Sequence, residues 1–217
     1  MGAFAVPAGP GGRGPDFYYE TMMKNILIIG GGTCSGKTTL AYIIAEKENG
    51  AVFSADDHLG EYAEKGIMAG CPICRLHASM PLNRFFMRDP GIQCEELIRF
   101  YQEIAPFVEE GLNQFCLQMD KEFVVAEGIA FLPEIAKRLM EKDSRITCRY
   151  LFADRETHDM LYRERSWTED FLRECEDGDE AFRLWMERDA LFSEYVRKAA
   201  QKEGMLITEG FLTDALS

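Results

Sequence analysis

An eight-residue segment constrains the fold of this chain more than any other feature of its sequence. Residues 31–38 read Gly-Gly-Thr-Cys-Ser-Gly-Lys-Thr, which satisfies the pattern G-x-x-x-x-G-K-[ST] in full. An apolar run at residues 26–29 precedes the segment, and a helical pattern begins at Thr38. Glycines let backbone N–H groups turn inward and a helix N-terminus attracts anions, so this order of elements forms a cradle for phosphate groups. The sequence therefore predicts a phosphate-binding loop, or P-loop, in an α/β domain.

The residues of this loop have distinct expected roles. Lys37 would place its charge on the β- and γ-phosphates of ATP, and the Thr38 hydroxyl would ligate Mg²⁺. The competing interpretation is a glycine-rich turn with an incidental lysine. We therefore expect ATP and Mg²⁺ as cofactors, with the nucleotide bound by Gly31, Gly32, Thr33, Cys34, Ser35, Gly36, Lys37, Thr38 and Thr39.

Short apolar runs alternate with longer amphipathic ones along the rest of the chain, which indicates a parallel sheet covered by helices on both faces. The segment 60–90 is expected to be irregular, and Pro106 is expected to kink or divide a helix at 95–119. Strands are expected at 26–29, 51–54, 123–126, 147–152 and 205–208, and the other helices at 38–47, 134–142, 155–173 and 180–202.

Length and composition limit the alternatives. A chain of 217 residues suits one α/β domain with a small lid. Its net charge of -13 argues against a nucleic-acid or anionic-membrane surface, and no apolar run approaches the roughly 20 residues that span a bilayer. Seven cysteines, an odd number, fit reduced thiols in the cytoplasm. Residues 1–22 are expected to be a flexible leader before a domain at 23–217, with Met22 or Met23 as a candidate start.

The end of the third expected strand narrows the class of P-loop protein. Residues 123–128 read Phe-Val-Val-Ala-Glu-Gly, and the guanine-reading tetrapeptides of GTPases are absent from the sequence. An apolar strand that ends in Glu127 and Gly128 resembles the uridine-kinase and nicotinamide-riboside-kinase branch of P-loop small-molecule kinases. The resemblance implies a sheet order of 2-3-1-4-5 in a three-layer sandwich. It also implies that Glu127 lies beside the waters of Mg²⁺.

Two aspartates follow the second expected strand. A carboxylate at the carboxyl end of a strand beside the P-loop strand lies at the crevice where substrate must bind. The resemblance to the small-molecule kinases implies that Asp56 receives the proton of the acceptor hydroxyl. Asp57 is the alternative, as a base, a metal ligand or a helix cap, and a purely structural reading has both residues capping a helix.

The fourth strand leads into a region, about residues 154–180, that the resemblance identifies as a lid. Lid arginines of such kinases close over the transferred phosphoryl group and stabilise its charge. Arg163 and Arg165 are the candidates, and a surface salt bridge is the alternative role for each. Because they are two residues apart, they cannot share one helix face unless the helix is broken. Arg163 is taken as the catalytic arginine.

A cluster of cysteines invites a metal interpretation. Cys71, Cys74 and His77 have the spacing of a half site for zinc, which needs a fourth ligand such as His58 or Cys94. A redox pair or plain packing are the alternatives. Cys34, within the P-loop, would be an oxidation-sensitive thiol if it were exposed near the helix dipole.

These features favour an ATP-dependent kinase that phosphorylates a hydroxyl of a small metabolite. The acceptor would bind in the insertion at 60–119, and nucleoside, sugar-like and antibiotic acceptors stay open, like those of uridine kinase, gluconate kinase, chloramphenicol phosphotransferase or the zeta-toxin kinases. The oligomeric state stays open too. One alternative is a nucleotide-binding regulator without phosphoryl transfer, against which the two carboxylates count, because a sensor needs no base. Another is a zinc-bearing interaction module.

Overall fold

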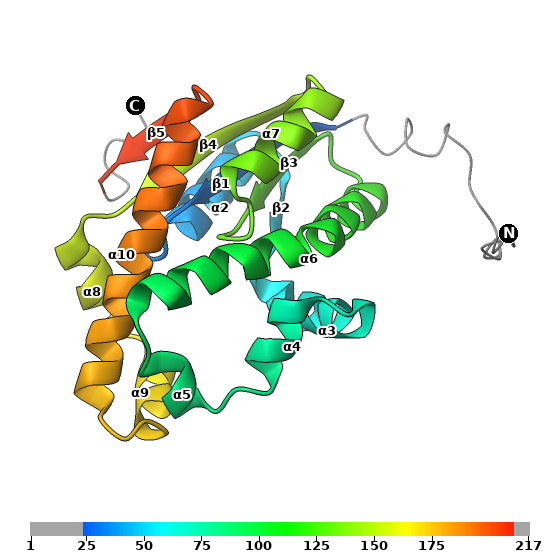
Figure 1. The fold of residues 1–217 in the computed structure, drawn as a ribbon. Helices are drawn as coiled ribbons and strands as arrows, with labels where there is room; N and C mark the ends of the chain where they lie inside the picture. Colours follow the sequence, from blue (N-terminus) through cyan, green and yellow to red (C-terminus); the bar gives the residue numbers. More distant parts are fainter. Residues whose placement is uncertain (1–23, 211–217) are drawn as a thin grey trace, which may run out of the picture.

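The computed structural model describes residues 24–210 (Figure 1). The expected leader, the candidate start methionines and residues 211–217 lie outside the described residues. The five strands form one all-parallel sheet in the order β2-β3-β1-β4-β5, so the predicted topology is confirmed. The strands are β1 (Asn25–Gly31), β2 (Ala51–Ser54), β3 (Phe123–Glu127), β4 (Ile146–Phe152) and β5 (Leu206–Glu209).

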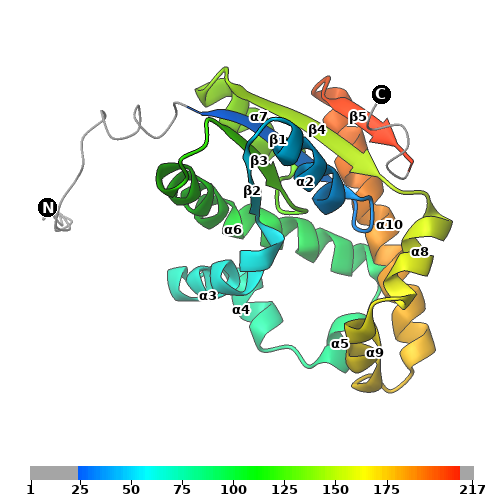
Figure 2. The ribbon, with the colours of Figure 1, turned by 180° about the vertical axis from the view of Figure 1, so that it is seen from behind.

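Helices cover the sheet on both faces and complete three layers (Figures 1 and 2). Successive residues of β1 point to opposite faces, as in any strand. Ile28 joins a core with helices of one face, whereas Ile29 joins a core with the helix of the other. Because the central strands β1 and β3 are buried on both faces, they read as continuous apolar runs. The first face carries α6 (Pro90–Gln118), α7 (Pro133–Lys142) and α10 (Gly178–Lys202), and the second carries α2 (Lys37–Lys47).

The strand register brings the predicted site residues to one edge of the sheet. Glu127, the last residue of β3, pairs with Ile29 of β1 on one side and with Ser54 of β2 on the other. The P-loop follows β1, and Asp56 follows β2 after one intervening residue. The carboxyl ends of three neighbouring strands therefore present the loop and both carboxylates together.

The insertion is more regular than its sequence indicates. The expectation of irregular structure at 60–90 is wrong, because the prolines and Gly70 stand at helix ends and the other two glycines are accommodated within a helix. Gly70 ends one helix with a φ of 86°, and Pro72 and Pro81 start the next two. Pro106 lies inside α6 without dividing it. The segment forms α3 (Leu59–Ala69), α4 (Pro72–Ala78), α5 (Leu82–Phe86) and the start of α6, after a 3₁₀ turn at Asp56–His58.

The expected single helix at 155–173 is two helices. These are α8 (Arg155–Arg163) and α9 (Ser166–Arg173), and the chain turns between them at Glu164 and Arg165. Together with α5 they pack against the N-terminal half of α10, around the buried ring of Trp185. Trp185 is therefore a core residue of this helical region. Within residues 24–210, no helix combines the length and the apolar character that crossing a membrane requires.

Candidate active site

The P-loop combines three residues of positive φ. They are Gly31 at 127°, Cys34 at 55° and Gly36 at 81°. A Cβ on Gly31 would overlap the carbonyl oxygen of Leu151 on the neighbouring strand, so only glycine fits there. Cys34 adopts a left-handed conformation that a non-glycine residue rarely takes. The loop therefore holds its shape partly against the preference of its own residues.

Lys37 lies beneath this loop. Its side chain is buried, and its ammonium donates to the carbonyl oxygen of Gly32 at 2.6 Å. The Ser35 hydroxyl donates to the same oxygen at 2.8 Å. Burial lowers the pKa of Lys37, while the carboxyls of Asp56 and Glu127 oppose that shift. The ammonium is thus a poorly solvated positive charge inside the cradle, which is the arrangement that binds phosphate strongly.

Of the two predicted aspartates, Asp56 is the one directed toward the loop. Its Oδ1 accepts the backbone N–H of Ile129 at 3.0 Å, just beyond β3. The residue has solvent-accessible surface, yet protein surrounds its carboxyl closely enough that desolvation raises its pKa, against the lowering effect of Lys37 and the Ile129 N–H. Asp56 and Asp57 are both exposed residues of the 3₁₀ turn, and Asp56 is the one whose carboxyl accepts the Ile129 N–H. Gly128 is required beside them, because a Cβ there would lie 2.9 Å from Asp56 Oδ1.

Glu127 is the most deeply buried of the predicted site carboxyls, with 1% of its surface exposed. Burial raises its pKa, and the hydroxyls of Ser54 and Thr38 lower it. Its Oε2 accepts no hydrogen bond from any residue in 24–210. A buried carboxylate oxygen without a partner, next to the hydroxyl of Thr38, has the donor chemistry of a Mg²⁺ site. These two residues therefore fit the metal that the sequence predicts.

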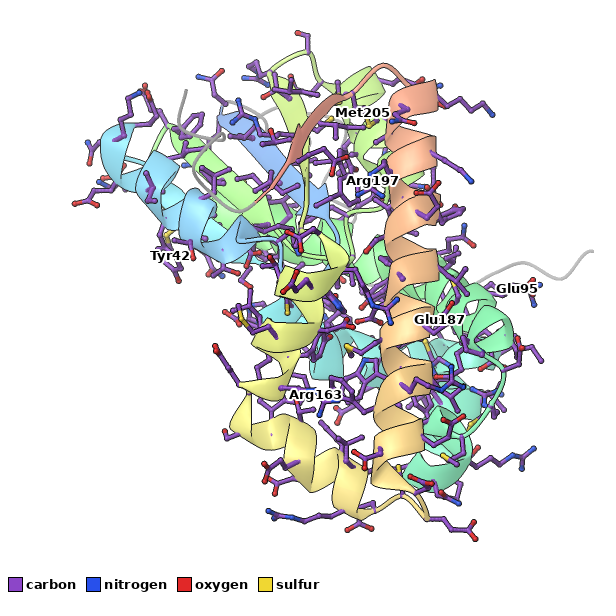
Figure 3. All side chains as sticks on the ribbon, turned by 90° about the vertical axis from the view of Figure 1, so that its left-hand side faces the viewer. Tyr42, Glu95, Arg163, Glu187, Arg197 and Met205 are labelled. Carbon is purple, nitrogen blue, oxygen red and sulfur yellow. The ribbon has the colours of Figure 1, made fainter. Side chains whose placement is uncertain are left out.

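The break between α8 and α9 separates the two arginines that were predicted to act from a lid. The guanidinium of Arg163 is exposed and lies 4.1 Å from the ring centre of Phe182, so it faces α10 (Figure 3). Arg165 lies over the rings of Tyr162 and Trp167, and its charge lowers the pKa of both Lys37 and Asp56. The interruption of the predicted continuous helix therefore gives the two arginines different surroundings, and the assignment of Arg163 as the catalytic arginine stays a prediction.

A buried polar network beside the loop was not predicted. Thr33 Oγ1 lies 2.8 Å from His158 Nε2 of α8 and 3.1 Å from Asp189 Oδ2 of α10. Arg188 donates from Nε and Nη2 to Asp189 Oδ1 at 2.8 and 2.6 Å. Burial by itself would raise the pKa of Asp189, but Arg188 and His158 hold it at about 2. The sequence carries no local pattern that indicates this network, because its members stand far apart along the chain.

The proposed zinc ligands are not brought together as a set. Cys71, Cys74 and Glu103 place their ligand atoms within 4.8 Å of one another, but His77 pairs with Glu96 at 3.3 Å. Glu103 instead accepts the backbone N–H groups of Ile73 and Cys74 at 3.0 Å, which caps α4. Burial, followed by Glu103, raises the pKa of Cys74 to about 12. A protonated thiol that packs in the core is the reading that these contacts favour.

Cys34 also differs from its expectation. Its side chain is buried, and desolvation raises its pKa in spite of the positive charges of Arg165 and Lys37. The thiol therefore stays protonated at neutral pH. An oxidation-sensitive thiolate requires exposure and a lowered pKa, so the condition on which that expectation depended is not met.

Thr39, the last predicted nucleotide contact, is exposed at the start of α2. A cavity of about 400 Å³ lies elsewhere, at the opposite ends of β4 and β5, where Thr147 and Leu206 contribute to its wall. It is remote from the P-loop, because parallel strands begin at one edge of the sheet and end at the other. The candidate site is therefore the group of residues at the carboxyl ends of β1, β2 and β3.

Comparison with known proteins bears only on the fold. No protein-family model matches the chain, and no curated protein matches its sequence. Solved structures with a similar arrangement include a protein of Thermus thermophilus, with 20% identity over 88% of this chain and 91% of that one and a TM-score of 0.49. A second is shikimate kinase from Bacteroides thetaiotaomicron, with 15% identity over 85% of this chain and 86% of that one and a TM-score of 0.41. A third is thymidylate kinase from Candida albicans, with 14% identity over 89% of this chain and 87% of that one and a TM-score of 0.39. The reaction is therefore inferred from the side chains of this chain alone.

Proposed function

We propose that this chain is an ATP-dependent phosphotransferase that moves the γ-phosphoryl group of Mg-ATP to a hydroxyl of a small metabolite. One observation carries the proposal. Asp56 and Glu127 follow or end adjacent strands, and the charges of both carboxyls act on the ammonium of Lys37. A nucleotide-binding regulator would need Lys37. It has no use for a second carboxyl that is held beside the loop with a raised pKa.

The proposed reaction assigns one task to each group. The backbone N–H groups of the P-loop and the ammonium of Lys37 bind the β- and γ-phosphates. Asp56 orients the acceptor hydroxyl and takes its proton. The acceptor oxygen then forms a bond to the γ-phosphorus in line with the leaving group, and the bond between that phosphorus and the bridging β–γ oxygen breaks to leave ADP. A raised pKa makes Asp56 a stronger base than a solvated aspartate, which suits this role.

Thr38 and Glu127 would hold Mg²⁺, Thr38 through its hydroxyl and Glu127 through water. When bound, the metal neutralises phosphate charge. Arg165 is proposed to stabilise the negative charge of the transferred group, because its charge already acts on Lys37 and Asp56. Most of the rate would come from positioning and charge neutralisation, since the protein forms no covalent bond to the phosphoryl group.

The acceptor is proposed to bind against the insertion of α3 to α6, which adjoins Asp56. Tyr101 of α6 supports this placement, because Asp56, after burial itself, is among the groups that raise the pKa of its phenol. Nucleosides, sugar-like alcohols and antibiotic hydroxyls all stay within the proposal. The free state of all seven cysteines is consistent with the proposed cytoplasmic location.

The test is ADP release from Mg-ATP in the presence of a panel of nucleosides, sugars, sugar acids and antibiotic alcohols. We expect one acceptor class to raise the rate above the water background. Asp56→Asn should remove that gain, whereas Asp57→Asn, a matched change on the exposed neighbour, should keep it. Stimulation that survives Asp56→Asn would contradict the assignment of the base. ATP binding without stimulation by any acceptor would favour the regulator.

A further inference from the structure

The phosphate loop is held on one side by a hydroxyl group that takes no part in the proposed reaction. Thr33 stands within the loop, but its hydroxyl contacts His158 and Asp189. His158 is 6% exposed and Asp189 is 3% exposed. Buried polar groups are costly unless they are paired, so a network of this kind is kept only where each member is satisfied. The network therefore joins three separate elements, which are the loop, α8 and α10.

Hydrogen-bond geometry indicates which form of His158 fits. Its Nδ1 lies 2.9 Å from Asp159 Oδ1, and its Nε2 lies 2.8 Å from Thr33 Oγ1 and 3.4 Å from Asp189 Oδ2. The Thr33 hydroxyl has one proton, and Asp189 Oδ2 accepts it at 3.1 Å. Nε2 must then donate to Thr33 Oγ1, and Nδ1 must donate to Asp159. Only the imidazolium, with a proton on each nitrogen, satisfies all of these contacts at once.

The position of Thr33 matters because the next residue is strained. Cys34 has a φ of 55°, which a side-chain-bearing residue holds only when its surroundings fix it there. Ser35 anchors the loop on the far side of Cys34 by donating to Gly32 O. Thr33 anchors it on the near side. The backbone N–H groups between these two anchors belong to the segment that would face the phosphates.

We propose that His158 is a positioning residue for nucleotide binding, which as an imidazolium holds Thr33 and so keeps the phosphate loop in its binding conformation. Asp189, itself fixed by Arg188, and Asp159 hold the imidazolium in place. The inference rests on the proposed function in one respect, namely that the ligand of the loop is a nucleotide. It adds a dependence on pH and a link between α8 and the loop that the proposed reaction does not contain.

The sign of the pH dependence follows from the charges around the ring. Although burial would lower the pKa of His158, the hydrogen bonds that its ring donates to Asp189 and Asp159 raise it above its ordinary value. The imidazolium, and with it the anchoring of Thr33, is present at low pH and lost as pH rises through that raised pKa. A bound phosphate nearby would raise the pKa further. Nucleotide affinity should therefore fall as pH rises, and binding should take up protons.

The other groups that face His158 do not titrate in the same range. Asp189 has a pKa of about 2, and Arg188 behind it is always charged. The second oxygen of Asp159 is occupied by Arg155 at 2.8 Å. Burial raises the pKa of the nearby Tyr162 phenol and of the Cys34 thiol, so both groups stay protonated at neutral pH. A change in charge near pH 7 at this network is thus assigned to His158.

The first measurement is the titration of the imidazole signals by NMR in the protein without nucleotide. The chain has 3 histidines, so single substitutions of His58 and His77 assign the signals. We expect His158 to titrate above the ordinary 6.5, and Thr33→Val, which removes one partner, to shift its titration. A titration of His158 at or below 6.5 would overturn the inference without any reference to the reaction.

The second measurement is the affinity for ADP by calorimetry between pH 6 and 9, in buffers of different ionisation enthalpy. We expect His158→Gln and Thr33→Val to weaken ADP binding by about three- to tenfold at the acidic end, the effect of one hydrogen bond, and to have little effect at the alkaline end. His77→Gln is the matched control and should follow the wild type. Because every variant binds the same ligand, the titration of ADP itself cancels from the comparison.

The outcomes separate this inference from the proposed function. If ADP binds with equal affinity and equal proton uptake in the wild type and in both network variants, the positioning role is refuted and the proposed function stands. If ADP binds at no pH between 6 and 9, both the proposed function and this inference are refuted. A pH-dependent loss of affinity in both variants, absent in His77→Gln, supports it.

Discussion

Asp189→Asn tests the energetics of the buried network directly. The carboxyl is 3% exposed and accepts two hydrogen bonds from the equally buried Arg188. A pKa of about 2 in place of the ordinary 3.8 means that the folded site favours the carboxylate by about 2.5 kcal/mol. Removal of the charge also leaves the guanidinium buried without its counter-ion. Breaking a buried pair in this way costs about 3 to 5 kcal/mol, so we expect a loss of that size in the free energy of unfolding.

Urea unfolding followed by tryptophan fluorescence provides the assay, because Trp185 lies in the same helix as Asp189. For a chain of this size the expected loss corresponds to a melting temperature lower by about 6 to 20 °C. Glu187→Gln, a matched change of an exposed carboxylate on α10, should alter the free energy of unfolding by less than about 0.5 kcal/mol. The difference between wild type and Asp189→Asn should shrink as pH falls from 4 toward 2, since the wild-type carboxylate is then protonated.

A double substitution tests whether the loss of stability comes from the unpaired buried charge of Arg188. Arg188→Leu combined with Asp189→Asn removes both charges, so no unpaired ion stays buried, and we expect the double variant to be more stable than the sum of the single changes by about 2 kcal/mol. A loss below about 1 kcal/mol for Asp189→Asn, or strict additivity in the double variant, would refute the reasoning that the pair is desolvated and mutually dependent.

Three further predictions follow from the site and its surroundings. Arg165→Ala is expected to lower kcat by about 10²-fold and Arg163→Ala to leave it nearly unchanged, as steady-state kinetics would measure; equal losses would contradict the assignment of Arg165. Because the pKa of Asp56 is raised, kcat/KM should fall on the acidic side at a pH above the 3.8 of an ordinary aspartate, and a pH–rate profile without that limb would exclude Asp56 as the base. Gly66→Ala places a Cβ 2.5 Å from Cys74 Sγ and should cost about 1 to 3 kcal/mol in thermal unfolding; if Cys74→Ala does not rescue it, the clash is not the cause.

The sheet and the loop could be predicted from sequence because their signals are local. A P-loop pattern fixes strand, turn and helix within one short segment, and buried parallel strands show themselves as apolar runs. The carboxylates at the ends of β2 and β3 were recognisable because parallel strands share one carboxyl edge. Their proximity to Lys37 follows from the register, in which Ser54 and Ile29 both pair with Glu127.

The structures of the insertion and of the segment that forms α8 and α9 were harder to predict from sequence. The contacts that determine them join residues that are distant along the chain. Gly70 and Pro72 read as loop residues, yet each also suits a helix end, and only the pairing of Glu103 with α4 distinguishes the two. The turn at Arg165 gives no signal in composition. The partners of Thr33 lie 125 and 156 residues away, so no pattern of spacing could have revealed them.

The helix α10 belongs to two cores at once. Its 25 residues extend over about 37 Å, with Trp185 packed against α5, α8 and α9 at one end and Val196 in the main core at the other. Because one end of this continuous helix packs in the core against the sheet, its other end cannot change direction unless those core contacts break. Because His158 of α8 also contacts Asp189 of α10, we expect α8 to keep its position relative to α10 and therefore relative to the sheet.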